Sequence, residues 1–185
     1  MDLHAAQIQG FFNIPLDHLE GMPILAKHFA REHNDNLVVV SPDLGSVNRA
    51  RKFATYLDAP IAIIDKRRPR PNVSEIMNII GDIEDKDVLI IDDIIDTAGT
   101  LCNAANALKE RGARSVRACA THGILSGPAI ERIQASAIQE LILLDTIPLT
   151  EEKQIDKIKV KTVAEIFAKA IDMIYSDKSV STLFV

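Results

Sequence analysis

The chain of 185 residues is 47% hydrophobic and 25% charged, and its formal net charge at pH 7 is −5. This length and composition suit one globular domain with a buried core, and the acidic balance argues against general binding to nucleic acids or anionic membranes. Neither a basic leader nor a long apolar segment is present, so we expect no nucleic-acid or membrane partner and a cytoplasmic location. Cys102 and Cys119 stand in helix and strand patterns, which predicts reduced core residues.

Short apolar runs alternate with helical patterns along the chain. Strands are expected at 37–41, 61–65, 88–91, 116–121 and 141–144, with weaker candidates at 76–81 and 158–160. Helices are expected at 21–33, 46–58, 101–112 and 163–174. Because the strand candidates are continuously apolar, they suit parallel strands that are covered on both faces. The sequence therefore predicts an α/β fold, a parallel sheet with helices on both faces, whose ligands bind in the strand-to-helix loops.

Residues 88–100 read VLIIDDIIDTAGT, which places acids directly after a buried strand. Asp92 and Asp93 should lie at its carboxyl end and point to opposite sides. The following turn opens a helix, so its free N–H groups, two hydroxyls and helix dipole form a phosphate cradle. Asp92 suits the vicinal hydroxyls of a sugar, and together these features predict a ribose 5-phosphate site. The alternative is an acidic strand end that caps a helix. The predicted cradle residues are Asp96, Thr97, Ala98, Gly99 and Thr100.

A second loop, SPDLGS at 41–46, also joins a strand to a helix. We expect its residues Asp43, Leu44, Gly45 and Ser46 to bind an anion, with the carboxylate of Asp43 available to Mg²⁺. If the last position requires a positive φ, Ser46 is strained there. Read alone, the segment is also compatible with an ordinary turn.

The third loop, DKRRPRPN at 65–72, carries four cations within five residues, with prolines between them. Such a segment cannot be core, and we expect an extended, mobile loop after a strand. Its functional interpretation is a lid over phosphates, where Lys66 and Arg68 stabilise charge that develops during phosphoryl transfer. The alternatives are a solvated basic loop and a nuclear-type signal.

Taken together, these loops resemble those of the ribose-phosphate pyrophosphokinases, which have the type I phosphoribosyltransferase fold. Residues 88–100 match the phosphoribosyl-pyrophosphate motif, SPDLGS the pyrophosphate loop, and the basic segment the catalytic loop, which typical salvage transferases lack. Further similarity lies in DLHAAQIQGFF at 2–12, THGILSGP at 121–128 and SVS at 179–181.

The resemblance implies that ribose 5-phosphate attacks the β-phosphorus of Mg²⁺-ATP, giving phosphoribosyl pyrophosphate and AMP. It implies catalytic roles for Lys66 and Arg68, with Arg68 also contacting the ribose phosphate, and Mg²⁺ ligation by His4 and Asp43. It further implies a homo-oligomer. An allosteric site for ADP or phosphate is implied at Ser179, Val180, Ser181 and Phe184.

The resemblance covers the whole chain but only the later part of such an enzyme. It divides the chain into three parts. Residues 1–16 are a remnant of the first domain, residues 17–176 are the ribose-phosphate-binding domain, and residues 177–185 are a tail. Much of the ATP pocket is expected from the missing first domain. We therefore expect apolar groups such as Phe11 and Phe184 to lack their usual cover, and the isolated chain to turn over ATP poorly or not at all.

Two alternatives remain open at this point. One is a phosphoribosyltransferase that uses phosphoribosyl pyrophosphate with a base, although no segment is set aside to hold a base. The other is a non-catalytic subunit that associates with a synthetase. His122 receives no catalytic role, because a loop that starts the next helix accounts for it.

Overall fold

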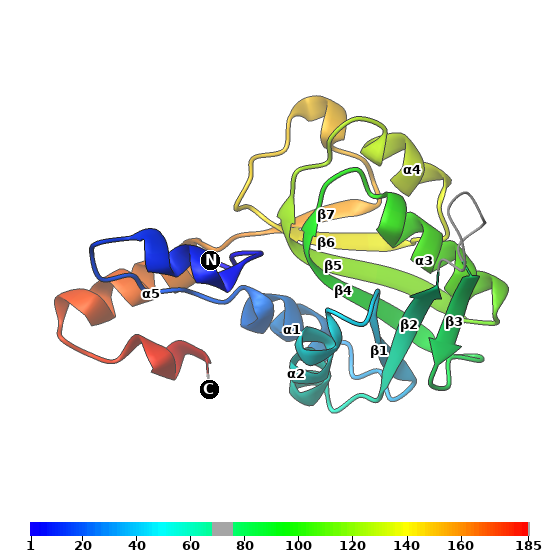
Figure 1. Ribbon diagram of the computed structural model, residues 1–185, viewed down its shortest axis with the longest axis horizontal. Helices are drawn as coiled ribbons and strands as arrows, with labels where there is room; N and C mark the ends of the chain where they lie inside the picture. Colours follow the sequence, from blue (N-terminus) through cyan, green and yellow to red (C-terminus); the bar gives the residue numbers. More distant parts are fainter. Residues whose placement is uncertain (68–75, 185) are drawn as a thin grey trace.

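The computed structural model describes residues 1–67 and 76–184. Its centre is a seven-stranded sheet with the order β3-β2-β1-β4-β5-β6-β7, shown in Figure 1. All neighbouring strands are parallel except β2 and β3. The predicted α/β class and mainly parallel sheet are thus confirmed, and both weaker strand candidates are real strands. The strands are β1 Leu37–Ser41, β2 Ile61–Arg67, β3 Ile76–Ile80, β4 Asp87–Ile95, β5 Ser115–Gly123, β6 Glu140–Leu144 and β7 Ile158–Lys161.

Helices cover both faces of the sheet, as predicted. In Figure 1, α3 and α4 lie on one face and α1 and α2 on the other, whereas α5 and the two termini lie beyond one side of the sheet. None of the helices in the described ranges combines the length and apolar character that a membrane span needs. The helices are η1 Ala6–Phe11, α1 Met22–Ala30, α2 Val47–Leu57, α3 Gly99–Glu110, α4 Ala129–Ala135, η2 Glu151–Lys153, α5 Ala164–Tyr175 and η3 Val180–Phe184.

Strand β4 explains why the apolar runs do not alternate with polar residues. Val88 and Ile90 pack into the core beneath α3, whereas Leu89 and Ile91 pack into the core on the opposite face. All four are at most 1% exposed. Because successive side chains of a strand point to opposite faces, a strand buried on both faces needs apolar residues at every position. Each of these burials contributes about 1.5–3 kcal/mol.

The order of the strands determines where a ligand can enter. From β1 the chain moves to β2 on one side and later returns to β4 on the other, so the order reverses between β1 and β4. The register of β1 with β4 ends at Val40–Ile90, but β4 pairs with β5 as far as Ile95–Gly123. The last residues of β4 therefore extend past the end of β1. Crevices at such a switch point are the usual ligand sites of α/β sheets.

At the opposite end of β4, Asp87 ties three segments together. Its Oδ1 accepts hydrogen bonds from Arg114 Nε at 2.9 Å and Ser115 Oγ at 2.6 Å. Its Oδ2 accepts one from Asn34 Nδ2 at 2.8 Å and another from Arg114 Nη2. The bonds from Arg114, followed by those from Ser115 and Asn34, outweigh burial and hold the pKa of Asp87 far below its ordinary value.

Asp87→Asn should reduce the free energy of unfolding at pH 7 by about 1–3 kcal/mol, because it weakens a buried, charge-assisted network. The pKa is lowered in the folded state, so this contribution is present above about pH 4 and is lost as the pH falls further. Urea unfolding between pH 3 and 8 measures it, with the exposed Asp156→Asn as control. Equal destabilisation at every pH, or none beyond the control, would contradict the assignment.

Candidate functional site

A hollow of about 510 Å³ opens at the switch point between β1 and β4. It unites three separately predicted segments: the amino-terminal residue His4, the loop after β1 and the loop after β4. Leu44 is the exception, since it lies outside the lining and is 61% exposed. The lining consists of His4, Asp43, Gly45, Ser46, Arg49, Asp92, Asp93 and residues 94–101.

The predicted phosphate cradle is the amino terminus of α3. Its first main-chain bond runs from Cys102 N to Ala98 O at 2.9 Å, and no side chain caps this terminus. The amides of Gly99, Thr100 and Leu101 therefore precede the helical ladder and line the hollow. Unpaired amides and the positive end of the helix dipole favour an anion.

The left-handed residue of this turn is Ala98, with φ 58° and ψ 7°, and not the glycine beside it. A non-glycine residue in this conformation costs about 1–2 kcal/mol and persists only where the surroundings enforce it. A Cβ at Gly99 would lie 3.3 Å from Arg132 Nη1, a close contact that the arginine side chain would have to relieve by a small shift. The sequence analysis correctly located the turn but did not identify this strain.

The loop between β5 and α4, together with α4 itself, supports the cradle through hydrogen bonds. Ser126 donates from its N–H to Asp96 O at 3.0 Å, and its hydroxyl donates to the Asp96 carboxylate. Arg132 Nη1 donates to Thr97 O at 2.9 Å. The sequence analysis named neither Ser126 nor Arg132 as a site residue, because their link to the cradle depends on tertiary contact.

The loop after β1 forms the second anion-binding turn. Ser46 donates from its N–H to Asp43 Oδ1 at 2.8 Å, and Ser41 Oγ donates to Asp43 O at 2.7 Å. Ser46 has φ −91°, so the conditional expectation of strain there is wrong. The Ser46 side chain makes no capping bond to α2, and the amide of Ser46 is instead bound by the Asp43 carboxylate. Two helix amino termini, those of α2 and α3, therefore border the same hollow.

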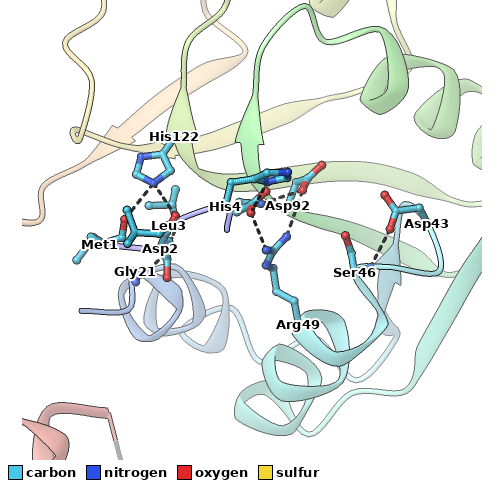
Figure 2. A network of polar contacts seen from close by, with 12 residues as sticks. Met1, Asp2, Leu3, His4, Gly21, Asp43, Ser46, Arg49, Asp92 and His122 are labelled. Atoms are coloured by element: carbon cyan, nitrogen blue, oxygen red, sulfur yellow. Dashed lines mark hydrogen bonds and ion pairs between the residues drawn. The ribbon is translucent and has the colours of Figure 1, made fainter. Parts of the chain in front are cut away.

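Arg49 bridges the two adjacent acids (Figure 2). Its Nη2 donates to Asp93 Oδ2 at 2.7 Å and its Nη1 to Asp92 Oδ1 at 3.3 Å. His4 Nδ1 lies 3.0 Å from the same Asp93 oxygen. The two acids lie within β4 and not at its end, and although alternation along the strand sends them to opposite sides, a single guanidinium contacts both.

The two carboxyl groups titrate differently. Burial, reinforced by the neighbouring Asp93, raises the pKa of Asp92 to about 6. Burial also acts against ionisation of Asp93, but Arg49 and His4 outweigh it and hold the pKa of Asp93 below its ordinary value. The environment thus favours the ionised form of Asp93 beside Arg49, while Asp92 becomes an ionised acceptor for hydroxyl groups or metal ions as the pH rises through its pKa of about 6.

The donor set fits Mg²⁺ that arrives with a phosphate ligand. Among the described residues, the group of three metal-type side chains that lies close enough to ligate one ion is His28, Glu32 and Glu140, which is outside the hollow. In the part of the chain that the structure describes, His4 and Asp43 therefore have no third metal-type side chain close enough to complete a metal site with them. Mg²⁺ commonly binds through one or two carboxylates, with phosphate oxygens and water completing the shell.

The remaining predicted residues belong to the basic segment and to the carboxyl-terminal tail. Strand β2 extends to Arg67, so the backbone of Lys66 belongs to a strand and the basic segment does not begin as a loop. Arg68 lies outside the described residues. The proposed allosteric residues lie on the carboxyl-terminal tail, where Ser179 and Ser181 bond each other at 2.7 Å and the Phe184 carbonyl accepts from Tyr56 at 3.1 Å.

Arg49 is the main functional residue that the sequence analysis missed. It stands in the first turn of α2, where acidic residues are favoured and where this helix has none. A positively charged residue at the positive end of a helix dipole is unfavourable unless an anion lies nearby. The position of Arg49 could therefore have indicated an anionic partner from the sequence.

Comparisons with known proteins agree with this geometry. Residues 66–185 match a family model described as phosphoribosyl synthetase-associated domain. The whole chain is 62% identical to a ribose-phosphate pyrophosphokinase of Clostridium acetobutylicum and 65% identical to that of Clostridium perfringens, covering 58% and 59% of them. A phosphoribosylpyrophosphate synthetase structure from Mycobacterium smegmatis aligns with TM-score 0.86 and 39% identity over 95% of this chain and 57% of that one. The chain thus spans less than two thirds of these relatives.

Replacing Asp92 or Asp93 by asparagine should change the free energy of unfolding in opposite directions. The pKa of Asp92 is higher in the folded state, so its stabilising contribution exists at low pH and is lost as the pH rises through 6. Asp92→Asn should therefore increase stability over the wild type at pH 8 by about 1–3 kcal/mol, with a smaller gain at pH 5. Asp93→Asn should decrease stability at pH 8, because Asp93 carries a lowered pKa. Urea unfolding at both pH values decides; the same sign for both variants would refute the assignment.

Proposed function

We propose that this chain, which belongs to the phosphoribosyl synthetase-associated domain family, is the ribose-phosphate-binding part of a ribose-phosphate diphosphokinase. The reaction transfers the diphosphoryl group of Mg²⁺-ATP to ribose 5-phosphate and gives phosphoribosyl pyrophosphate and AMP, for nucleotide biosynthesis. The main observation behind this proposal is that one hollow combines the amino termini of α2 and α3 with a pair of carboxyl groups whose pKa values are shifted in opposite directions.

Each part of the hollow suits one part of the sugar phosphate. The α3 cradle, residues 96–100, holds the 5-phosphate through amides and hydroxyls. Asp92 accepts hydrogen bonds from the ribose hydroxyls, and the loop 43–46 receives the pyrophosphate at the α2 terminus. Asp43 and His4 hold Mg²⁺, which supplies charge neutralisation at the phosphates.

Lys66 and Arg68 are proposed to stabilise the transferring group, on the basis of the family resemblance. Support comes from the backbone: β2 runs parallel to β1, so its carboxyl end opens on the same sheet edge as the hollow. Cations there would face charge that develops on the phosphoryl oxygens. Positioning and electrostatics suffice, and no covalent intermediate is needed.

Cellular location and assembly are also proposals. Cys102 and Cys119 are both free and buried, which fits the reducing cytoplasm. Phe11 is 86% exposed and Ile14 71%, while on α5 Tyr175 is 90% exposed. Such apolar exposure supports both a homo-oligomer and the proposed division into 1–16, 17–176 and 177–185, with the terminal parts covered in the whole protein.

Ribose 5-phosphate should bind the isolated chain, and Thr100→Val should weaken binding about tenfold. The substitution preserves side-chain shape but removes one hydroxyl donor to the phosphate, which is worth about 1.5 kcal/mol. Calorimetry measures the affinity. The matched control is Thr150→Val, at an exposed position on the loop after β6 that does not line the hollow. Unchanged affinity in Thr100→Val, or no binding to the unmodified chain, would count against the cradle.

The isolated chain should form no AMP above background from Mg²⁺-ATP and ribose 5-phosphate. Among the described residues that line the hollow, none is a phenylalanine, tyrosine or tryptophan on which adenine could stack. Coupled-enzyme detection of AMP tests this, with a full-length ribose-phosphate pyrophosphokinase as positive control. Sustained AMP production would overturn the expectation. Nucleotide formation from a base and phosphoribosyl pyrophosphate would instead support the phosphoribosyltransferase alternative.

A further inference from the structure

The first four residues, Met1–His4, form an ordered strap that reaches the edge of the hollow (Figure 2). We call this segment the N-terminal strap. Asp2 donates from its N–H to Leu19 O at 3.0 Å, and Leu3 donates from its N–H to His18 Nε2 at 2.9 Å. The strap is therefore bonded to the segment that leads into α1.

Asp2 and His122 hold the strap from the sheet side. Asp2 Oδ2 accepts from Gly21 N–H at 2.9 Å and from the Thr121 hydroxyl. His122 Nε2 lies 3.2 Å from Met1 O and 3.0 Å from Asp2 O. Since carbonyl oxygens only accept, Nε2 must carry the proton and donate. Thus one side chain of the strap and two of its carbonyls are bound at the end of β5.

The same contacts keep Asp2 in an unfavourable conformation. Its φ is 39°, in the left-handed region, which a non-glycine residue adopts only when its surroundings enforce it. His122 is itself fixed on its other side, because its Nδ1 lies 2.9 Å from Thr146 Oγ1 on the loop after β6. The imidazole therefore joins three segments: β5, the loop after β6 and the strap.

His4 follows directly after this anchored backbone. Its side chain is 76% exposed, yet its Nδ1 lies 3.0 Å from Asp93, whose side chain is 4% exposed. Packing cannot hold so exposed a ring in place. The position of His4 at the hollow therefore depends on the backbone of the strap as well as on the bond to Asp93.

We propose that His122 and Asp2 are positioning residues, which fix the strap so that His4 faces Asp93 and the phosphate-binding hollow. The proposal rests on the proposed function in one respect, the role of His4 as a ligand of phosphate-bound metal. Ordering the strap before the ligand arrives removes an entropic cost from binding. His122, which the sequence analysis left without a role, thereby acts on the site without touching a ligand.

The experiment compares His122→Ala, His122→Gln, His4→Ala and the double variant His4→Ala with His122→Ala, all in the 185-residue chain. The probe is Mn²⁺ with pyrophosphate, measured by electron paramagnetic resonance. His122→Ala should weaken Mn²⁺-pyrophosphate binding about tenfold, the cost of ordering one or two backbone residues. The double variant should bind no more weakly than His4→Ala, because His122 acts through His4. His122→Gln should recover much of the affinity, since its amide N–H can donate to the same carbonyls.

Additive losses in the double variant would overturn the proposal, as would an equal loss of metal-free ribose 5-phosphate binding. His33→Ala, at an exposed histidine after α1, is the control for loss of a histidine as such.

A second measurement needs no ligand and separates this proposal from the proposed function. The NMR order parameter of the His4 amide should fall in His122→Ala and in Asp2→Ala, while amides of β4 stay rigid. If the unmodified chain does not bind Mn²⁺-pyrophosphate, the ligand role of His4 fails, and the order parameter still decides the positioning claim. An unchanged order parameter in both variants would overturn it.

Discussion

Two adjacent carboxylates inside a parallel sheet require a cation, and the pairing of Arg49 with Asp92 and Asp93 meets this requirement. Burying a charge without a partner costs several kcal/mol, so the guanidinium and the acids depend on each other. Arg49 belongs to the first turn of α2, and the pair therefore also secures the amino terminus of that helix beside the end of β4. This contact thus helps to hold the α2 terminus at the hollow, whose place is set by the switch point between β1 and β4.

The arrangement separates two kinds of recognition within one small space. The amides at the start of α3 and α2 favour anions, whereas Asp92 favours hydroxyl groups or metal ions. A ligand that carries both a phosphate and vicinal hydroxyls can bind the helix amides and Asp92 at the same time. Neither the amides nor Asp92 alone would select such a ligand. Because burial raises the pKa of Asp92 to about 6, its share of this recognition depends on pH, while Asp93 stays ionised beside Arg49.

Contacts between distant segments complete the site. His4 reaches Asp93 across 89 residues of sequence, and His122 holds the carbonyls of Met1 and Asp2 across about 120. Behind the cradle, Ser126 and Arg132 brace Asp96 and Thr97. The side chains of the cradle are thus local in sequence, but their supports come from the loop after β5 and from α4.

The sequence by itself determined the strands, the helices α1, α2, α3 and α5, and the place of the cradle, but it did not predict α4. Continuous apolar runs predict parallel strands buried on both faces, and VLIIDDIIDTAGT carries its strand, turn and helix start in one contiguous stretch. Only the tertiary structure decided that β3 is antiparallel, that Ala98 is the left-handed residue, and that Arg49 and His4 meet at the hollow. It also decided that His122 holds the strap that precedes His4. The physical reason is the sequence distance over which each feature is determined. Periodicity is local and predicts which face of a strand or helix a side chain occupies. The partner on that face depends on strand register and helix placement, which are set by packing across the whole domain.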